Sequence, residues 1–149
     1  MENSTQFQEI FKELIEDLDY KKSEIPKRIG IDYDVFTKIM DYGRIPKPII
    51  LIRIADYFNV SIEYLLGRTN EIYFEKSTLS KSFYERYTEL KNLYQLTDYA
   101  VAQKLHIATS YTSNWKKKGF IPSLTNLILL SEIFETTLDY LLGRTDYKN

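Results

Sequence analysis

An internal repeat constrains the fold of this 149-residue chain more than any other feature. The hexapeptide Tyr-Leu-Leu-Gly-Arg-Thr occurs at residues 64–69 and again at residues 140–145, an offset of 76 residues. At this offset residues 7–70 align without a gap with residues 83–146, and 17 of the 64 pairs are identical. Chance similarity does not readily give an identical hexapeptide in a gapless register, so the chain is two copies of one unit.

Each copy has the pattern of five short helices. In the first copy, apolar residues recur three and four positions apart along the opening helix, as in Phe7, Phe11 and Leu14. Thr5 with Gln8 has the spacing of a capping box at the start of this helix. Further candidate caps are Ser23 in the first copy and Ser82 with Glu85, Thr97, Ser123 and Thr137 in the second. We therefore expect an all-α fold with domains at residues 1–69 and 82–149 and a linker at residues 70–81.

The second copy contains two predicted helices, residues 97–105 and 109–118, that are separated by a tight turn. A short helix held across another helix by such a turn can enter the major groove of DNA. His106 in the turn aligns with Gly30, which predicts a residue with positive φ. The residues that we expect to face inward are Ala100, Leu105, Ile107, Thr112 and Trp115.

The outward side chains of the third helix, and the basic residues at its end, are the candidate DNA contacts. They are Thr109, Ser110, Tyr111, Ser113, Asn114, Lys116, Lys117 and Lys118. Hydroxyl and amide groups can read base edges or phosphates, and Asn114 can pair with adenine through two hydrogen bonds. Residues 103–120 hold four lysines and no acid, which favours phosphate contacts. The alternative is a solvated polar face on a plain helical bundle.

The segment at residues 105–122, in which Ser-Asn-Trp is followed by three lysines, glycine and Ile-Pro, resembles a known family. It is similar to the helix-turn-helix of the phage lambda-repressor and Cro-like (XRE-type) transcriptional regulators. Residues 62–67 and 138–143 resemble the closing helix of that family. The resemblance covers nearly the whole chain and implies two tandem lambda-repressor-like five-helix domains. It also implies that the third helix enters the major groove, often in a dimer on a palindromic operator.

The sequence departs from the family's pattern at two places. Family members often pair an arginine of the first helix with a glutamate just before the glycine that ends the third helix. The matching positions here hold Lys91 with Lys117, and Ile15 with Asp41. Asp98 stands where the second helix often presents a polar phosphate contact, and its carboxylate would repel phosphate.

The first copy is the weaker candidate for a DNA reader. Residues 27–44 hold four basic and three acidic groups, so this region lacks the charge of its counterpart. Its candidate contacts are Tyr33, Thr37, Lys38 and Arg44. We therefore expect the second copy to dominate DNA binding.

Composition narrows the class of protein. The absence of cysteine excludes a disulfide framework and a thiolate metal site, and it suits a reducing cytosol. The sequence shows neither a secretory signal nor an apolar stretch long enough to cross a bilayer. It also lacks a glycine-rich phosphate loop, a zinc-ligand cluster and a nucleophile elbow. We expect a cytoplasmic protein that is not an enzyme and has no cofactor, metal, membrane association or small-molecule ligand.

The expected partner is double-stranded DNA, and the expected function is that of a sequence-specific transcriptional regulator, a repressor. The net charge of −1 counts against a nucleic-acid ligand and keeps a second function open. This alternative is a protein-binding adaptor or inhibitor that reuses the helix-turn-helix scaffold. The linker contains Ile72, Tyr73 and Phe74, which either pack on a domain or make the contact of a homodimer. We expect a homodimer.

Overall fold

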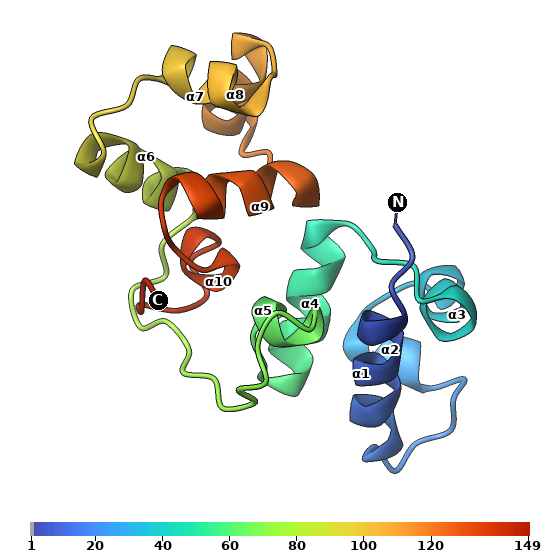
Figure 1. Cartoon of the computed structure of the whole chain (residues 1–149). Coiled ribbons are helices and arrows are strands. Elements are labelled where there is room, and N and C mark those ends of the chain that lie inside the picture. The colour runs from blue at the N-terminus through green and yellow to red at the C-terminus, as the bar shows by residue number, and fades with distance from the viewer. Residues whose placement is uncertain (1) are drawn as a thin grey trace. The chain divides into compact units, whose positions relative to one another are not determined.

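The computed structural model describes residues 2–149, and every regular element in this part of the chain is a helix (Figure 1). The expected all-α fold is therefore confirmed. The chain divides between Phe74 and Glu75 into two compact units, here named unit 1 and unit 2. The helices of unit 1 are α1 (Thr5–Glu16), α2 (Ile25–Ile29), α3 (Tyr33–Tyr42), α4 (Pro48–Phe58) and α5 (Ile62–Leu65). Those of unit 2 are α6 (Phe83–Leu93), α7 (Asp98–Leu105), α8 (Thr109–Lys118), α9 (Leu124–Ile133) and α10 (Leu138–Leu141).

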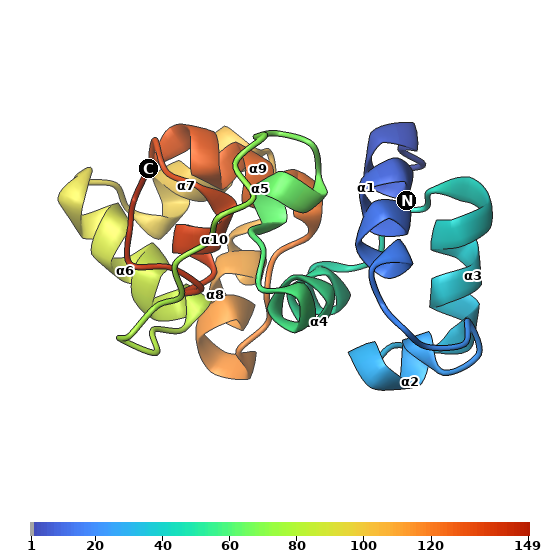
Figure 2. The same cartoon turned by 90° about the horizontal axis from the view of Figure 1, so that it is seen from below.

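The core of unit 1 forms where α1 packs against α3 and α5 (Figure 2). Phe7, Phe11 and Ile15 line the buried face of α1, as their helical spacing predicts. The ring of Phe11 meets that of Phe36 from α3 edge to face, with 5.9 Å between centroids. The apolar face of α1 therefore fixes its contact with α3.

The cap of α1 lies one residue earlier than the sequence predicts. Ser4, not Thr5, occupies the capping position, and its hydroxyl accepts a hydrogen bond from the backbone N–H of Phe7 at 3.1 Å. The side chain of Gln8 does not return to the cap but donates to the carbonyl of Met40 in α3 at 2.8 Å. Both residues can cap a helix, and the packing of α1 on α3 decides between them.

The start of α2 also differs from the prediction. Glu24 stands at its N-cap without a side-chain hydrogen bond, so Ser23 is not the cap. The counterpart α7 begins at Asp98, a position equivalent to three residues before Ile25. Proline clashes with the carbonyl four residues before it and is tolerated only in the first turn of a helix. Pro26 therefore delays the start of α2, because a helix as long as α7 would place proline in its interior.

The predicted caps of unit 2 are confirmed. Ser82 and Glu85 form a reciprocal capping box at the start of α6. Thr97 caps α7 through the N–H of Ala100 at 3.1 Å. Ser123 and Thr137 accept the equivalent hydrogen bonds at the starts of α9 and α10. These short helices therefore begin where their own sequence directs.

An aromatic cluster forms the centre of unit 2. The ring of Trp115, 3% exposed, meets those of Phe83 and Tyr87 edge to face at 5.6 and 5.3 Å. Phe134, the residue that ends α9 at its C-cap, packs on Tyr87 from another side at 6.2 Å. The cluster joins α6, α8 and α9, and it confirms Trp115 as a core residue.

The arginine of the repeated hexapeptide has the same partner position in both units. In unit 1 the Nε of Arg68 lies 2.8 Å from a carboxylate oxygen of Glu63. In unit 2 Arg144 pairs with Asp139, and both side chains are almost fully buried. The arginine thus links the end of the closing helix to its start, which explains why it recurs in the repeat.

Residues 75–81, more than half of the predicted linker, belong to unit 2. The backbone N–H of Ser77 donates to the carbonyl of Arg144 at 2.8 Å, and the hydroxyl of Thr145 donates to the carbonyl of Glu75 at 2.9 Å. Gly143, at φ 75°, lets the chain pass so closely that a Cβ there would lie 1.8 Å from the carbonyl oxygen of Lys81. Residues 75–81 are therefore a strap on unit 2, and residues 70–74 remain as the connection.

Asp146 holds this strap. Its carboxylate accepts hydrogen bonds from the hydroxyls of Ser77 and Thr78 and from the backbone N–H of Thr78 at 2.9 Å. It also lies 3.2 Å from a guanidinium nitrogen of Arg86, whose side chain is 2% exposed. The hydrogen bonds from Ser77 and Thr78 lower the pKa of Asp146 to about 2, and the charge of Arg86 adds to this effect. Asp146 therefore stays ionised at neutral pH.

The three apolar residues of the connection do not share one environment. The side chains of Ile72 and Tyr73 are 57% and 72% exposed, whereas Phe74 is half-buried. Of the three side chains, only that of Phe74 is therefore covered enough to fit the prediction that the segment packs on a domain. The dimer contact at this segment stays a prediction.

Candidate nucleic-acid interface

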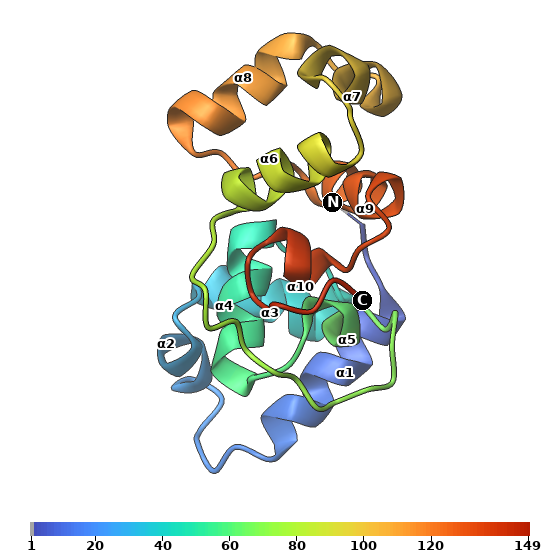
Figure 3. The same cartoon turned by 90° about the vertical axis from the view of Figure 1, so that its left-hand side faces the viewer.

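Helices α7 and α8 pack against one another at one end of unit 2 (Figure 3). His106 ends α7 in the left-handed conformation with φ 57°, as expected for the turn. Leu105, Thr112 and Trp115 are buried, as their predicted orientation requires. The other two residues that we expected inside are only half-buried: they are Ala100 and Ile107, and their places in the core are taken by Val101 and Ala102.

The opposite face of α8 is open to solvent. The exposed candidates are Thr109, Ser110, Tyr111, Ser113, Lys116, Lys117 and Lys118. Within residues 2–149, the hydroxyls of Ser110 and Ser113 have no hydrogen-bond partner. Asn114 differs from the prediction because it is half-buried, and its amide also has no partner among the described residues. This face therefore presents free donors and acceptors of the kind that read base edges.

The segment that carries this face has charges of one sign. Residues 99–131 include α8, nearly all of α7 and most of α9, and they contain no aspartate or glutamate. Four lysines lie in this range: Lys104, Lys116, Lys117 and Lys118. The last three follow one another at the end of α8, where a cation also interacts favourably with the helix dipole. A polyanion approaching α8 thus meets only positive or neutral side chains of this segment.

Asp98, at the start of α7, does not carry an unbalanced charge. One of its carboxylate oxygens lies 2.8 Å from the Nζ of Lys91 and accepts a hydrogen bond from the hydroxyl of Tyr87 at 2.7 Å. Partial burial opposes ionisation, but the hydrogen bonds from Lys91 and Tyr87 outweigh it and hold the pKa of Asp98 below its usual value. The positive charge of Lys91 therefore offsets the repulsion of phosphate that the sequence led us to expect from Asp98. Lys91 stands at the position where family members often have an arginine.

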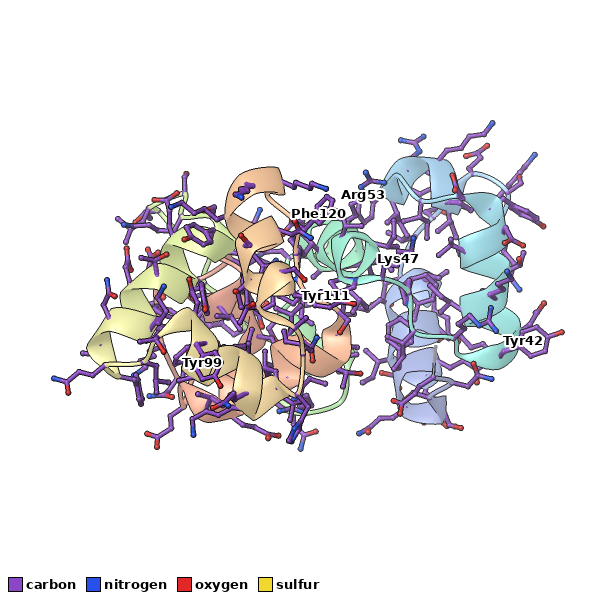
Figure 4. The ribbon with its side chains drawn as sticks, turned by 90° about the horizontal axis from the view of Figure 1, so that it is seen from above. Tyr42, Lys47, Arg53, Tyr99, Tyr111 and Phe120 are labelled. Carbon is purple, nitrogen blue, oxygen red and sulfur yellow. The ribbon has the colours of Figure 1, made fainter. Side chains whose placement is uncertain are left out.

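A groove of about 650 Å³ lies beside the exposed face of α8. It is bounded by the turn before α8, by α8 itself, by the loop after it and by the first turn of α9. Its lining includes the rings of Tyr111 and Phe120 (Figure 4), which are 55% and 53% exposed. The amides of Asn114 and Asn126 also belong to the lining. Phe120 and Asn126 were not among the predicted site residues. An aromatic residue directly after the glycine that ends α8 was the available signal for Phe120.

Unit 1 has a groove at the equivalent place, but its chemistry differs. This groove of about 260 Å³ is lined by Asp34, Val35, Lys38, Arg44 and Lys47, among others. Most of its lining residues align with those of the unit 2 groove at the repeat offset, so that Val35, Lys38 and Arg44 take the places of Tyr111, Asn114 and Phe120. A lysine and an arginine thus replace the amide of Asn114 and the ring of Phe120.

The predicted contacts of unit 1 are partly engaged within the unit. The Nζ of Lys38 lies 3.0 Å from a carboxylate oxygen of Asp34, one turn earlier in α3. The hydroxyl of Thr37 donates to the carbonyl of Asp34 at 2.9 Å. Tyr33 is 64% exposed, and Arg44 is exposed too. The α3 face therefore keeps fewer free polar groups than the α8 face.

The loop after the third helix is held differently in the two units. In unit 1 residues 2–4 run beside it: the N–H of Ser4 donates to the carbonyl of Gly43 at 2.8 Å, and Asn3 and Arg44 form an isolated β-bridge. The equivalent segment of unit 2 lies in the strap that Asp146 holds. Within the described chain, Gly119, Phe120 and Ile121 consequently make no backbone hydrogen bonds of this kind. The loop that carries Phe120 is thus free of the pairing that fixes Arg44.

Among residues 2–149, no group of three or more histidine, cysteine, aspartate or glutamate side chains is arranged to hold a metal ion. None of the helices described is both long and apolar enough to cross a membrane.

Comparison with known proteins gives one informative similarity. No family model matches the chain, and no solved structure matches it. The chain is 31% identical over 62 residues to an uncharacterized HTH-type transcriptional regulator, YobD of Bacillus subtilis (strain 168). The matched region covers 42% of this chain and 55% of that protein, so the chain spans about half the length of its relative. The chain is therefore similar to a helix-turn-helix transcriptional regulator.

Proposed function

We propose that the chain is a sequence-specific DNA-binding transcriptional regulator that inserts α8 of unit 2 into the major groove. The observation that carries the proposal is the exposed face of α8, where unpartnered hydroxyl and amide groups lie beside three consecutive lysines. Free amides and hydroxyls can specify bases, whereas lysines bind phosphates of any sequence. The similarity to a regulator of the helix-turn-helix type supports the same function.

The two units differ in charge, and we propose different roles for them in DNA binding. Unit 2 carries ten basic and eight acidic residues, whereas unit 1 carries ten basic and thirteen acidic residues. The ion pair of Lys38 with Asp34 further reduces the free positive charge on α3. We assign base reading to unit 2 on these grounds.

Repression and dimerisation complete the proposal. A bound protein blocks a promoter by occupying it, which needs no contact beyond those to DNA. Two copies of unit 2 in a homodimer would meet major grooves about 34 Å apart on a palindromic site. Unit 1 or the exposed Ile72 and Tyr73 would hold the pair. The proposal gives the chain no catalytic activity and no cofactor.

Selection from a random library of duplexes, performed with the full chain at low salt, tests the function. The expected result is an enriched site whose affinity falls steeply as salt rises, because phosphate contacts release counterions. Light scattering of the free protein and the stoichiometry on the selected duplex test the dimer. Protection of an asymmetric two-part site by a monomer would instead assign unit 1 as a second reader.

The outcome that would overturn DNA recognition is equally definite. If no site is enriched at low salt, the helix-turn-helix scaffold serves another purpose. The protein-binding adaptor or inhibitor is then favoured, and the acidic groups of α3 are the first surface to examine in unit 1.

A further inference from the structure

The unit 2 groove beside α8 has a composition that indicates what kind of base edge it takes. It joins two exposed aromatic rings, Tyr111 and Phe120, to the amides of Asn114 and Asn126. Neither amide has a hydrogen-bond partner among residues 2–149. An apolar surface beside an unpartnered amide fits a ligand that presents a methyl group beside a hydrogen-bonding edge.

One base pair presents that combination in the major groove. Adenine offers an acceptor and a donor that an asparagine amide can bind together, and its partner thymine carries a 5-methyl group. Aromatic side chains can contact this methyl group. Guanine and cytosine lack it, so the combination distinguishes an A·T pair from a G·C pair.

The charge around the groove selects a nucleic acid as the occupant. Lys116, Lys117 and Lys118 directly follow Trp115, one of its lining residues, in the sequence, and residues 99–131 contain no acid. The Nζ of Lys118 lies 5.6 Å from the centre of the Phe120 ring, so a phosphate-binding cation and the apolar surface are neighbours. The groove of unit 1 has Lys38 and Arg44 at the places of Asn114 and Phe120, and thus lacks both the amide and the ring.

We propose that the groove formed by Tyr111, Asn114 and Phe120 recognises an A·T pair, with the aromatic rings contacting the thymine 5-methyl group. This inference rests on the proposed function and deepens it by naming the base pair that unit 2 reads. Phe120 is a specificity-determining residue here, although it lies outside the third helix. The loop that carries it lacks the backbone pairing of its unit 1 counterpart, which leaves the ring free to meet the base.

Replacing thymine with deoxyuracil tests the contact, because this change removes only the methyl group and leaves base pairing intact. The full-length protein is titrated with its selected duplex and with duplexes carrying deoxyuracil at one A·T position at a time. Burial of one methyl group corresponds to an affinity loss of about fourfold, which we expect at one position of each half-site. Phe120→Ala should weaken binding to the thymine duplex and abolish the difference between thymine and deoxyuracil.

The matched control is Arg44→Ala, which removes the exposed side chain at the equivalent place in unit 1. This variant should keep the fourfold difference between thymine and deoxyuracil. Circular dichroism checks that both variants fold, as the exposure of the two side chains leads us to expect.

The possible results distinguish failure of the proposed function from failure of this inference alone. If selection enriches no site, both the proposed function and this inference fail. If a site is enriched but deoxyuracil has no effect at any position, the groove does not contact a thymine methyl group. If the effect of deoxyuracil persists in Phe120→Ala, Phe120 does not determine the specificity and its assignment is refuted. The proposed function then stands without it.

Discussion

The hydrogen bond from Tyr87 to Asp98 gives a prediction whose size follows from the structure. The hydroxyl of Tyr87 donates to a carboxylate oxygen of Asp98 at 2.7 Å, and the ring is fully buried among Trp115, Phe83 and Phe134. Tyr87→Phe removes this donor and keeps the ring. Unit 1 has phenylalanine, Phe11, at the equivalent position, so the scaffold accepts the substitution.

The expected loss of stability is about 1.5 kcal/mol. A hydrogen bond to a charged group contributes about 1.5–3 kcal/mol. We take the lower end because the Asp98 side chain is 48% exposed and keeps its ion pair with Lys91. For a small unit with an m-value near 1 kcal/mol/M in urea, the midpoint should fall by about 1.5 M.

Fluorescence in urea measures this change in unit 2 alone, because Trp115 is the single tryptophan of the chain. The pKa of Asp98 is lowered in the folded unit, so its contribution to stability is present above its unfolded pKa and is lost as the pH falls through the folded pKa. The difference between Tyr87→Phe and the wild type should therefore be large at pH 7 and shrink below about pH 4.

Tyr84→Phe is the matched control, because the hydroxyl of Tyr84 has no hydrogen-bond partner among the residues described. It should leave the midpoint unchanged. Equal midpoints for Tyr87→Phe and the wild type, or a difference that does not depend on pH, would refute the assignment of Asp98 as a charged acceptor.

The remaining predictions concern the interface and the frame of unit 2. Alanine at Lys116–Lys118 should weaken binding to every duplex and reduce the slope of log affinity against log salt by up to about three, as measured by fluorescence anisotropy; an unchanged slope would exclude phosphate contacts. Asn114→Ala should cost about 1–3 kcal/mol on the selected site and little on unrelated duplexes, whereas equal losses would show a backbone contact only. Because the folded pKa of Asp146 is about 2, its contribution to the stability of unit 2 should be lost as the pH falls from about 4 towards 2, and Asp146→Asn should flatten this dependence in urea titrations. Gly143→Ala should lower the melting temperature of unit 2 more than Gly119→Ala does. A Cβ at residue 119 meets no atom within 4 Å, so this variant loses only about 1–2 kcal/mol of stability from the left-handed backbone conformation. Equal shifts in melting temperature would mean that the strap moves aside from a Cβ at residue 143 without loss of stability.

The sequence predicted those features that depend on neighbouring residues. The caps Thr97, Ser123 and Thr137 and the turn at His106 were predicted correctly because each acts within a few positions of its own helix. The fold class followed from helical periodicity for the same reason. The cap of α1 was misplaced by one residue because its exact start depends on contacts with α3, which lie far along the chain.

Long-range polar pairs could not be predicted. The ion pair of Arg86 with Asp146 joins residues 60 positions apart and has no counterpart in unit 1, where Ile10 and Asn70 occupy the equivalent places. The family's pattern pairs the position of Lys91 with that of Lys117, so it did not predict the ion pair of Lys91 with Asp98. Asn114 is half-buried and lines a groove together with the loop that carries Phe120, and a helical wheel does not contain that loop.

The strap at residues 75–81 limits the length of the free connection between the two units. Because Asp146 secures it to unit 2, only residues 70–74 connect the units, and five residues span at most about 18 Å. If unit 2 binds DNA as proposed, the bound duplex is an intramolecular ligand for unit 1, at an effective concentration that short connections raise to about the millimolar range. Contacts from Arg44 or Lys47 that are too weak to retain DNA in isolated unit 1 would prolong the lifetime of the complex in the intact chain.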